Sequence, residues 1–433
     1  MATGSSGGSL RLFRDREFLA LASTAFARAQ AYSTILIALA LYADLFDTTG
    51  TVEGLFGTAF AVVQLVIVLP MGRWIDLNNS KRFLLIGLLL NIVVFVGFSL
   101  VQTVEHVIFM RVVQGIGASI LWITGSAVVG EISPDDSRGL WLGTYNQVGA
   151  FSSLAGDVFG GLLLYLYGFQ LTYAVLIAVT TFATAMVYLN LRDNPGGQAD
   201  PDEATGVETL RNLLDRTAVR ALVIFRLAFS VGKMAVIIFL PIYARTEFGI
   251  NPFAIGGILA GGKLTKSLLQ GKVGDVTDRY GTYRYFIFLG ALIYGVGTGL
   301  IPLAEYAHRV FPAVTLATAG STMTLPPAFF SLFLAYAVLG VGDSFRLPAS
   351  MAVFVEEGEY FDAVAGSMSL RSIAWKIGQV SGPVAVGFIW DRTSVFGAFW
   401  TAAGFIILSS LVFLVLYRSE GAPEHALSAT PGD

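Results

Sequence analysis

The 433-residue chain contains no cysteine, only three histidines and few charged residues, which make up 13% of it. Without cysteine it forms no disulfide and has no thiol to act as a nucleophile or a metal ligand. His106, His308 and His425 lie far apart in the sequence, so we expect no metal site. The formal net charge of -3 lacks the basic excess of a nucleic-acid-binding protein, so we also expect no nucleic acid as a partner.

Apolar residues, in contrast, are abundant. Hydrophobic residues make up 55% of the chain, and its mean hydropathy is +0.70. This composition excludes a soluble globular protein, because too few polar residues remain to cover the surface of two or three domains. A transmembrane helix needs about 20 apolar residues, so the apolar fraction is enough for about a dozen such helices. The first apolar stretch contains Arg28 and is longer than the core of a signal peptide, so we expect it to be retained as a transmembrane helix.

Apolar stretches separated by short polar breaks predict an all-α membrane protein with 12 transmembrane helices in two pseudo-symmetric six-helix bundles. The predicted helices cover 18–43, 52–75, 83–102, 105–130, 140–164, 172–191, 219–244, 254–273, 285–305, 328–354, 365–389 and 396–417. The expected domains are an N-terminal segment (1–17), a first bundle (18–191), a linker (192–218), a second bundle (219–417) and a tail (418–433). Within the linker, residues 207–216 are predicted to form a short interfacial helix.

The distribution of lysine and arginine predicts the orientation in the membrane. Fifteen of these residues fall in loops and termini on one side, and three fall on the other. Positive residues accumulate on the cytoplasmic side. We therefore expect a multi-pass protein of the plasma membrane with both termini in the cytoplasm, and with the lipid bilayer as its surroundings.

The two halves of the chain repeat each other. Gly72, Asp76 and Arg82 recur 202 residues later, and Gly156 recurs 226 residues later as Gly382. Such internal repeats are typical of transporters. The change in offset predicts an insertion of about 23 residues between the ninth and tenth helices, at 304–327, which would form an extracellular loop or hairpin.

Two polar loops, 72–82 and 273–284, follow the second and eighth helices. Each combines an aspartate at a helix end, a tight turn and a basic cluster, which can dock on a neighbouring helix terminus. They resemble the first signature of the major facilitator superfamily, G-x-x-x-D-(R/K)-x-G-x-(R/K)-(R/K). The second copy matches through Asp278, Arg279 and Gly281, whereas the first has Leu77 and Asn79 in place of the basic residue and the glycine. Asparagine tolerates a left-handed backbone, which predicts that the turn is kept.

Three further segments carry the resemblance over nearly the whole chain. FMRVVQGIGAS matches the signature R-x-x-Q-G-x-G-A through Arg111 and Gln114, and EISPDDSRG resembles the loop E-x-x-P-x-x-x-R-G. AGDVFGG is similar to the exporter signature G-P-x-x-G-G but has Asp157 in place of proline. Arg111 has an alternative interpretation, in which its side chain snorkels outward near the start of its helix.

The resemblance implies a secondary active transporter that works by alternating access of two bundles around a central cavity, as a symporter or antiporter, with a small molecule as substrate. We expect a monomer without a cofactor, and no enzyme. The signature loops would act as a conformational latch, and the alternative is that they only anchor the topology. The latch residues are Gly72, Asp76, Lys81, Arg82, Gly274, Asp278, Arg279, Arg284, Glu131 and Arg138.

Within the predicted helices, nine basic residues face only two acidic ones, Asp157 and Asp343. Intramembrane charges normally face a cavity and mark a substrate pathway, so the excess of cations predicts an anionic substrate. The alternative is that these cations pair with backbone carbonyls or that the helix limits are wrong. The candidate substrate-binding residues are Arg28, Tyr32, Gln64, Arg111, Asn146, Lys233, Lys263, Lys266, Arg371 and Lys376.

Four residues are candidates for proton coupling: Asp157, Arg111, Asp343 and Glu53, the last of which is alternatively a solvated residue at the outer end of its helix. Asp343 and Arg346 are three residues apart, so we expect them to pair on one helix face. Arg226 and Arg346 lie near cytoplasmic helix ends, where arginine can snorkel. Two alternative functions remain open: a multidrug or lipophile efflux pump of the same fold, and a lipid or lysolipid flippase.

Overall fold

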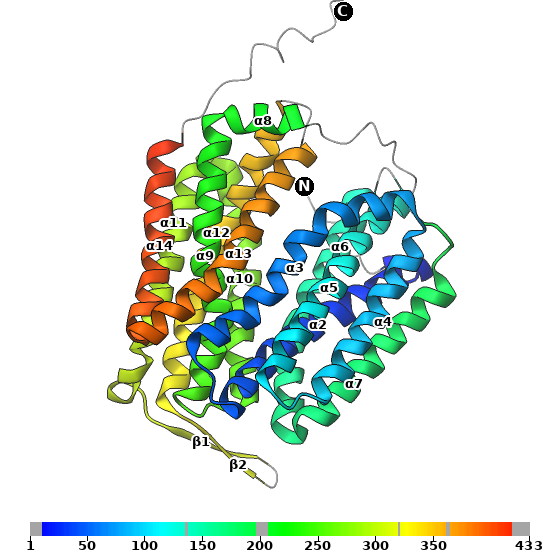
Figure 1. Cartoon of the computed structure of the whole chain (residues 1–433). Helices are drawn as coiled ribbons and strands as arrows, with labels where there is room; N and C mark the ends of the chain where they lie inside the picture. The colour runs from blue at the N-terminus through cyan, green and yellow to red at the C-terminus, as the bar shows by residue number, and fades with distance from the viewer. Residues whose placement is uncertain (1–10, 135–136, 196–206, 319–320, 361–363, 418–433) are drawn as a thin grey trace, which may run out of the picture. The chain divides into compact units, whose positions relative to one another are not determined.

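The structure, a computed structural model, describes residues 11–134, 137–195, 207–318, 321–360 and 364–417. It consists of helices and one short hairpin (Figure 1). In the first half these are α2 (Arg16–Leu45), α3 (Gly50–Leu77), α4 (Ser80–Ser99), α5 (Val104–Ile132), α6 (Arg138–Ala155), the π-helix η1 (Gly156–Gly160) and α7 (Gly161–Asn190). In the second half they are α8 (Val207–Asp215), α9 (Thr217–Thr246), α10 (Pro252–Tyr280), α11 (Tyr283–Leu300), the 3-10 helix η3 (Ile301–Arg309), β1 (Val314–Thr318), β2 (Ser321–Leu325), α12 (Pro327–Glu359), α13 (Val364–Arg392) and α14 (Val395–Leu416).

The predicted helices all have counterparts in the described part of the chain. Helix 140–164 corresponds to α6, η1 and the start of α7, and helix 172–191 to the remainder of α7. The break between these two falls at Gly168, whose φ of 68° and ψ of -163° are accessible to glycine but strained for other residues. The short helix predicted at 207–216 is present as α8. Residues 1–10 and 418–433, which the sequence assigns to the termini, lie outside the described residues.

Nine stretches in the described residues are long and apolar enough to cross a membrane, and one of them, 138–190, contains the two helices that meet at Gly168. Two long helices, α10 and α13, are not among the nine. The first carries Lys263 and Lys266, and the second carries Arg371 and Lys376. The two helices that fall short of the apolarity of a membrane span therefore carry four of the seven cations among the candidate substrate-binding residues.

The insertion at 304–327 contains a β-hairpin, one of the two forms that the sequence predicts. Strands β1 and β2 pair antiparallel, with Val314 opposite Leu325 and Thr318 opposite Ser321 (Figure 1). Alternation of threonine with apolar residues, as in VTLAT and STMTL, favours strands over helix at this point.

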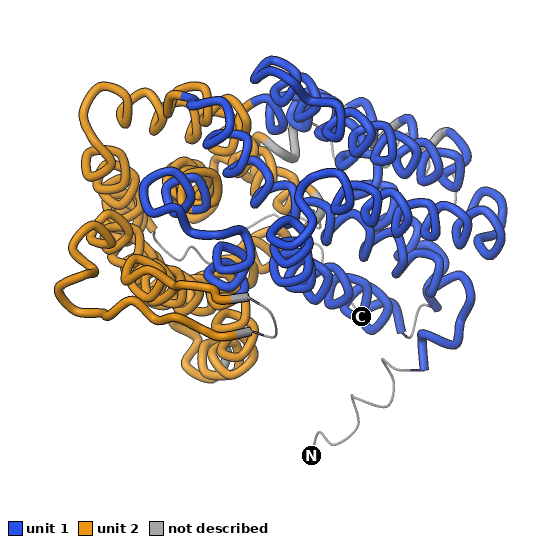
Figure 2. The backbone as a smooth tube through the Cα atoms, turned by 90° about the horizontal axis from the view of Figure 1, so that it is seen from below, with its two compact units in different colours: residues 1–48, 59–200, 241–260 blue, residues 49–58, 201–240, 261–433 orange. Residues whose placement is uncertain are grey.

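The chain divides into two compact units (Figure 2). Unit 1 comprises 1–48, 59–200 and 241–260, and unit 2 comprises 49–58, 201–240 and 261–433. Each unit thus contains most of one predicted bundle and one short segment from the other half of the sequence. The core of unit 1 is built from apolar side chains of α2, α4, α5, α6 and α7, among them Phe18, Leu84, Leu121 and Trp141.

The short segments 49–58 and 241–260 each make a close helix contact, and the two contacts occupy equivalent positions in the sequence repeat. In unit 2, Gly54 approaches α13 so closely that a Cβ there would lie 2.5 Å from the carbonyl oxygen of Pro383. In unit 1, Gly256 lies against the carbonyl oxygen of Asp157. Gly256 follows Gly54 by 202 residues, and Pro383 follows Asp157 by 226, which are the two repeat offsets. The repeat found in the sequence therefore extends to the packing of these helices.

Candidate functional site

Unit 2 contains a carboxylate surrounded by cations. Asp343, on α12, accepts hydrogen bonds from Lys233 on α9 and from Arg346 one turn along its own helix, the latter at 2.7 Å. Lys266 on α10 lies 4.0 Å from the same carboxylate. The predicted pairing of Asp343 with Arg346 is confirmed, and two of the predicted substrate-binding lysines meet at this aspartate.

Aromatic rings hold several of these cations. The guanidinium of Arg346 lies 4.0 Å from the ring centre of Phe229, and that of Arg226 lies 4.4 Å from the ring centre of Trp375. The ammonium of Lys233 is 5.1 Å from the ring centre of Tyr294. A cation is attracted to the face of an aromatic ring, and the attraction strengthens where water is excluded. The rings therefore fix the positions of charges that would otherwise be mobile.

Three arginines of unit 2 have nitrogens that no hydrogen bond satisfies. Arg226 and Arg346 are only 7% and 1% exposed, so the prediction that they snorkel to the membrane surface is wrong. The Nε and Nη1 atoms of both arginines, and the Nε of Arg371, are buried without a hydrogen-bond partner in the structure. The charges of Arg346 and Arg371 repel that of Arg226. Buried donors without partners are costly, and in native proteins they are rare.

The helices bring these residues together through side-chain periodicity and close packing. Arg226, Phe229 and Lys233 follow one another at spacings of three and four residues, which places them on one face of α9. Arg371 and Trp375 likewise share a face of α13, because they are four residues apart. At Gly382 of α13 a Cβ would lie 2.5 Å from the carbonyl oxygen of Val231 on α9, so the two helices touch backbone to backbone. This approach sets Trp375 against Arg226.

The two remaining predicted cations of unit 2 lie on α10 and α13. Lys376 donates a hydrogen bond of 3.1 Å to the Oε1 of Gln379, one turn along α13. Lys263 is half-buried on α10, three residues before Lys266. The contact with Gln379 gives Lys376 a neutral hydrogen-bond partner.

In unit 1, Arg111 is fully buried on α5. It donates a hydrogen bond of 2.6 Å to the Oε1 of Gln114, and its guanidinium lies 4.3 Å from the ring centre of Phe60. Its side chain also makes a hydrogen-bonding contact with the phenol of Tyr32 on α2. The structure thus brings together two of the predicted substrate-binding residues, and it excludes the alternative that Arg111 snorkels outward.

The other predicted binding residues of unit 1 occupy different surroundings. Arg28, on α2, lies 4.4 Å from the ring centre of Trp122, and its Nε is buried without a hydrogen-bond partner. Gln64 is buried on α3, whereas Asn146 is exposed on α6. Arg28, like Arg111, therefore contacts an aromatic ring in unit 1.

Two predicted proton-coupling carboxylates besides Asp343 are also buried. Asp157 is completely buried in η1, at the point where the helix widens between α6 and α7. Single π-helical turns occur frequently at functional sites. Glu53, at the start of α3, is 5% exposed, so the alternative that it is solvated is wrong.

Three of the predicted latch residues, Lys81, Arg138 and Arg284, lie at the starts of α4, α6 and α11. Lys81 donates a hydrogen bond of 2.6 Å to the carbonyl oxygen of Leu191, the C-cap residue of α7. The ammonium of Lys81 is also 3.4 Å from the carboxylate of Asp193. This is the docking of a basic residue on a helix terminus that the sequence predicts. Arg138 donates to the carbonyl oxygen of Gly130 at 2.9 Å, and Arg284 to the hydroxyl of Tyr285 at 2.6 Å.

The two signature loops differ in their turns. Gly281 has a φ of 61°, in the left-handed region that favours glycine. Asn79, at the equivalent position of the first loop, has a φ of -64° and caps α4 by accepting a hydrogen bond from the backbone N–H of Lys81. The prediction that Asn79 keeps the left-handed turn is therefore wrong, because its side chain serves as a helix cap instead.

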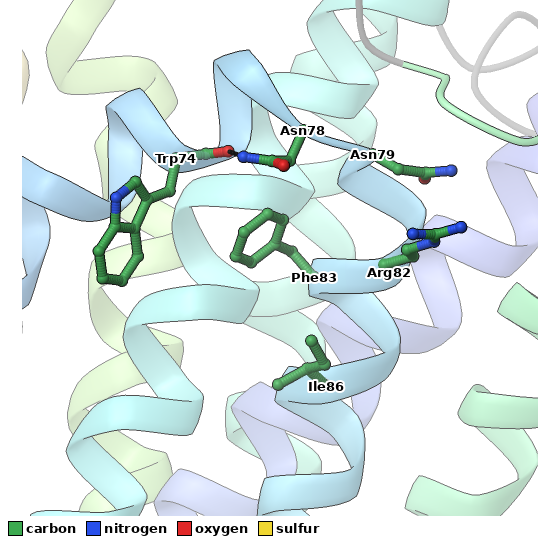
Figure 3. A pocket seen from close by; sticks show the side chains of 6 residues that line it. All are labelled: Trp74, Asn78, Asn79, Arg82, Phe83 and Ile86. Atoms are coloured by element: carbon green, nitrogen blue, oxygen red, sulfur yellow. Dashed lines mark hydrogen bonds between the residues drawn. The ribbon is translucent and has the colours of Figure 1, made fainter.

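Among the remaining latch residues, Glu131 and Arg279 are exposed and Gly274 is within α10. Gly72 is within α3, and the side chains of Asp76 and Asp278 lie outside what the structure describes. Arg82 lines an open pocket of about 350 Å³ where α4 follows α3, together with Trp74, Asn78, Asn79, Phe83 and Ile86 (Figure 3).

Comparison with known proteins agrees with this architecture. The family model of the Major Facilitator Superfamily matches residues 21–329 and again 222–432. The chain belongs to the major facilitator superfamily. It is therefore a multi-pass membrane protein and a secondary transporter of a small molecule, and it is not an enzyme.

Its relatives are distant in sequence but cover most of the chain. An uncharacterized MFS-type transporter of Methanocaldococcus jannaschii is 22% identical over 86% of this chain and 91% of that protein. Multidrug resistance protein 1 of Bacillus subtilis is 23% identical over 79% of this chain and 82% of that protein. The crystal structure of a bacterial homolog of the human lysosomal transporter Spinster has a TM-score of 0.73 at 16% identity, covering 96% of this chain and 100% of that chain.

Proposed function

We propose that this transporter moves a small organic anion by alternating access, and that the cations of unit 2 bind it. One observation carries the proposal: Arg226, Arg346 and Arg371, whose charges repel one another, have buried nitrogens without hydrogen-bond partners. Among the described residues, Asp343 is the carboxylate that pairs with Arg346. With Lys233 and Lys266, five cations accompany one described carboxylate, which leaves four positive charges. Like charges at this density repel one another, and an anion relieves both the repulsion and the unmet donors.

We also propose that transport is coupled to protons and that Asp157 carries the proton. A carboxyl group inside the membrane is rare and is typical of a proton relay. Asp157 is fully buried, and its backbone carbonyl packs against Gly256 of the neighbouring helix. Protonation of Asp157 would therefore change the charge at a helix contact. Glu53 and Arg111 are further candidates, whereas we assign Asp343 the role of counter-ion to the cations.

A ligand screen tests the anionic substrate. Purified protein is heated in detergent with panels of anionic, neutral and cationic metabolites of matched size. A ligand at 100 times its dissociation constant stabilises the folded state by about 2.7 kcal/mol. We expect stabilisation by members of the anionic panel only. Stabilisation by neutral or cationic compounds, with the anions inactive, would refute the proposal.

Efflux of lipophilic drugs is the second candidate function. The Bacillus subtilis relative is named a multidrug resistance protein, which favours this reading. Expression in an efflux-deficient host separates the two candidates. An efflux pump lowers the sensitivity of the host to several unrelated drugs, whereas a transporter of organic anions leaves the sensitivity to lipophilic cations unchanged.

We propose further that both termini are cytoplasmic, that the loops 72–82 and 273–284 latch one state of the transport cycle, and that the protein is a monomer. The chain contains no cysteine, so single cysteines can report the topology without background. Thr315→Cys in β1 should react with an impermeant maleimide in intact cells, whereas Asn78→Cys should react only after permeabilisation. The reverse pattern would refute the orientation.

A further inference from the structure

The donors of Arg226, Arg346 and Arg371 also carry information about the chemical group that they bind. We propose that the substrate presents a dianionic phosphoryl group to these three arginines. This inference rests on the proposed function, since it names the substrate class of the same site. Of these three arginines, the sequence predicts only Arg371 as a binding residue. Arg226 and Arg346 are therefore additional binding residues.

The charge balance favours a dianion. Arg226, Lys233, Lys266, Arg346 and Arg371 together exceed the charge of Asp343 by four. A carboxylate or a sulfate ester neutralises one of these four charges, whereas a phosphate monoester carries about -1.5 to -2 at neutral pH. The phosphoryl group therefore relieves up to twice as much of the repulsion among the guanidinium groups.

The donor pattern points to the same group. Five nitrogens of these three arginines are buried without a hydrogen-bond partner: Nε and Nη1 of Arg226, Nε and Nη1 of Arg346, and Nε of Arg371. A carboxylate offers two oxygens, whereas a phosphoryl group offers three strong acceptor oxygens. Arginine is the residue best suited to phosphate, because its planar guanidinium donates hydrogen bonds in a fixed fork. Three arginines arranged around three oxygens satisfy more of these donors than two oxygens do.

The aromatic rings keep this arrangement in place before the substrate arrives. Trp375 lies against Arg226 at 4.4 Å and Phe229 against Arg346 at 4.0 Å, while Asp343 holds another nitrogen of Arg346 at 2.7 Å. Groups that are already fixed lose little conformational entropy when a ligand binds. Trp375 is thus a positioning residue, which acts on the anion through Arg226.

Calorimetric titration of the full chain in detergent tests the inference with three ligands that share a phenyl ring: phenyl phosphate, phenyl sulfate and benzoate. Phenyl phosphate and phenyl sulfate have the same shape and differ in charge. At pH 8 we expect phenyl phosphate to bind about tenfold more tightly than either of the others, a difference of about 1.4 kcal/mol. Since the second pKa of a phosphate monoester is about 6, this preference should disappear at pH 5.

Variants locate the site. Arg226→Lys and Arg371→Lys keep the positive charge but remove the forked donors of the guanidinium. Each should therefore weaken the binding of phenyl phosphate about tenfold and that of benzoate much less. Arg220→Lys, at an exposed position six residues before Arg226 on α9, should leave all three affinities unchanged. Trp375→Leu should weaken phenyl phosphate, and Trp375→Phe should restore most of the affinity because a ring again faces Arg226.

The possible results separate this inference from the proposed function. Equal affinities of the three anions at pH 8 would overturn the inference that the substrate carries a phosphoryl group, while the proposal of an anionic substrate would stand. Absence of binding by all three would also overturn the inference of a phosphoryl group. The proposed function would then fail only if no member of the broader anionic panel stabilised the protein. If a variant fails to fold, the pH dependence of the unaltered protein still decides the question.

Discussion

Removing the carboxylate of Asp343 should destabilise unit 2 strongly. Asp343→Asn preserves the shape of the side chain but removes the negative charge that Lys233, Lys266 and Arg346 share. Asparagine also has an amide in place of one acceptor oxygen, so at least one of the cations loses its partner. The substitution creates no cavity, and its effect is therefore electrostatic.

The size of the effect follows from the burial of the cluster. Asp343 is 6% exposed, and its partner Arg346 is 1% exposed. Removing one partner of a buried ion pair costs about 3–5 kcal/mol, because the remaining charge is buried without compensation. Lys233→Met should cost less, because Asp343 keeps its hydrogen bond of 2.7 Å with Arg346. In the double variant the two costs should overlap by about 1–3 kcal/mol, as is usual for residues in contact.

Denaturant unfolding in detergent, followed for the two single variants and the double variant, measures these terms. Asp275→Asn is the matched control, because Asp275 is an exposed carboxylate on α10 of the same unit. It should change the free energy of unfolding by less than about 0.5 kcal/mol. A cost for Asp343→Asn as small as that of the control would show that this carboxylate does not compensate the buried cations. Strictly additive costs in the double variant would show that Asp343 and Lys233 do not stabilise each other.

Three further predictions follow from other residues. Asp157→Asn should abolish the dependence of uptake on a pH gradient in proteoliposomes, and unchanged gradient-driven uptake would remove Asp157 from the coupling mechanism. Burial raises the pKa of Asp391, beyond the predicted span 365–389, but hydrogen bonds from Thr51 and Gly50 outweigh it and hold the pKa below its usual range. Its contribution to stability is therefore present above about pH 4 and lost as the pH falls through the lowered pKa. Lowering the pH from 7 to 3 should therefore lower the melting temperature of the unaltered protein more than that of Asp391→Asn. Equal changes in the two proteins would contradict this. Gly382→Leu should separate α13 from α9 and lower both the melting temperature and the anion affinity, and an unaltered affinity in a folded variant would show that this contact does not shape the site.

Most of the fold follows from hydropathy and from the internal repeat. The apolar stretches predict the helices because lipid requires each spanning segment to satisfy its own backbone hydrogen bonds. The change of repeat offset also locates the hairpin at 314–325. The π-helix at 156–160 was not predicted, because a widened turn has no periodicity of its own in the sequence. The exchange of 49–58 and 241–260 between the units was likewise not predicted, because it depends on contacts far apart in sequence.

The candidate site could be predicted only in part. The excess of cations in the second half is visible in the sequence, and so is the pairing of Asp343 with Arg346. The positions of Arg226 and Arg346 near helix ends predict snorkelling, whereas in the folded unit Trp375 and Phe229 pack against them. The spacing of Arg226, Phe229 and Lys233 on α9 was the available signal. Asn79 shows a similar limit, because one residue type suits both a left-handed turn and a helix cap.

Uptake into proteoliposomes tests the central claim most directly, which is that the cations of unit 2 serve an anionic substrate. Labelled anionic, neutral and cationic solutes are offered to the unaltered protein, to Arg371→Gln and to the exposed control Arg220→Gln. We expect the unaltered protein and the control to take up an anion, and Arg371→Gln to lose this uptake. Transport of neutral or cationic solutes at equal rates by all three proteins, with anions neither moving nor competing, would contradict it.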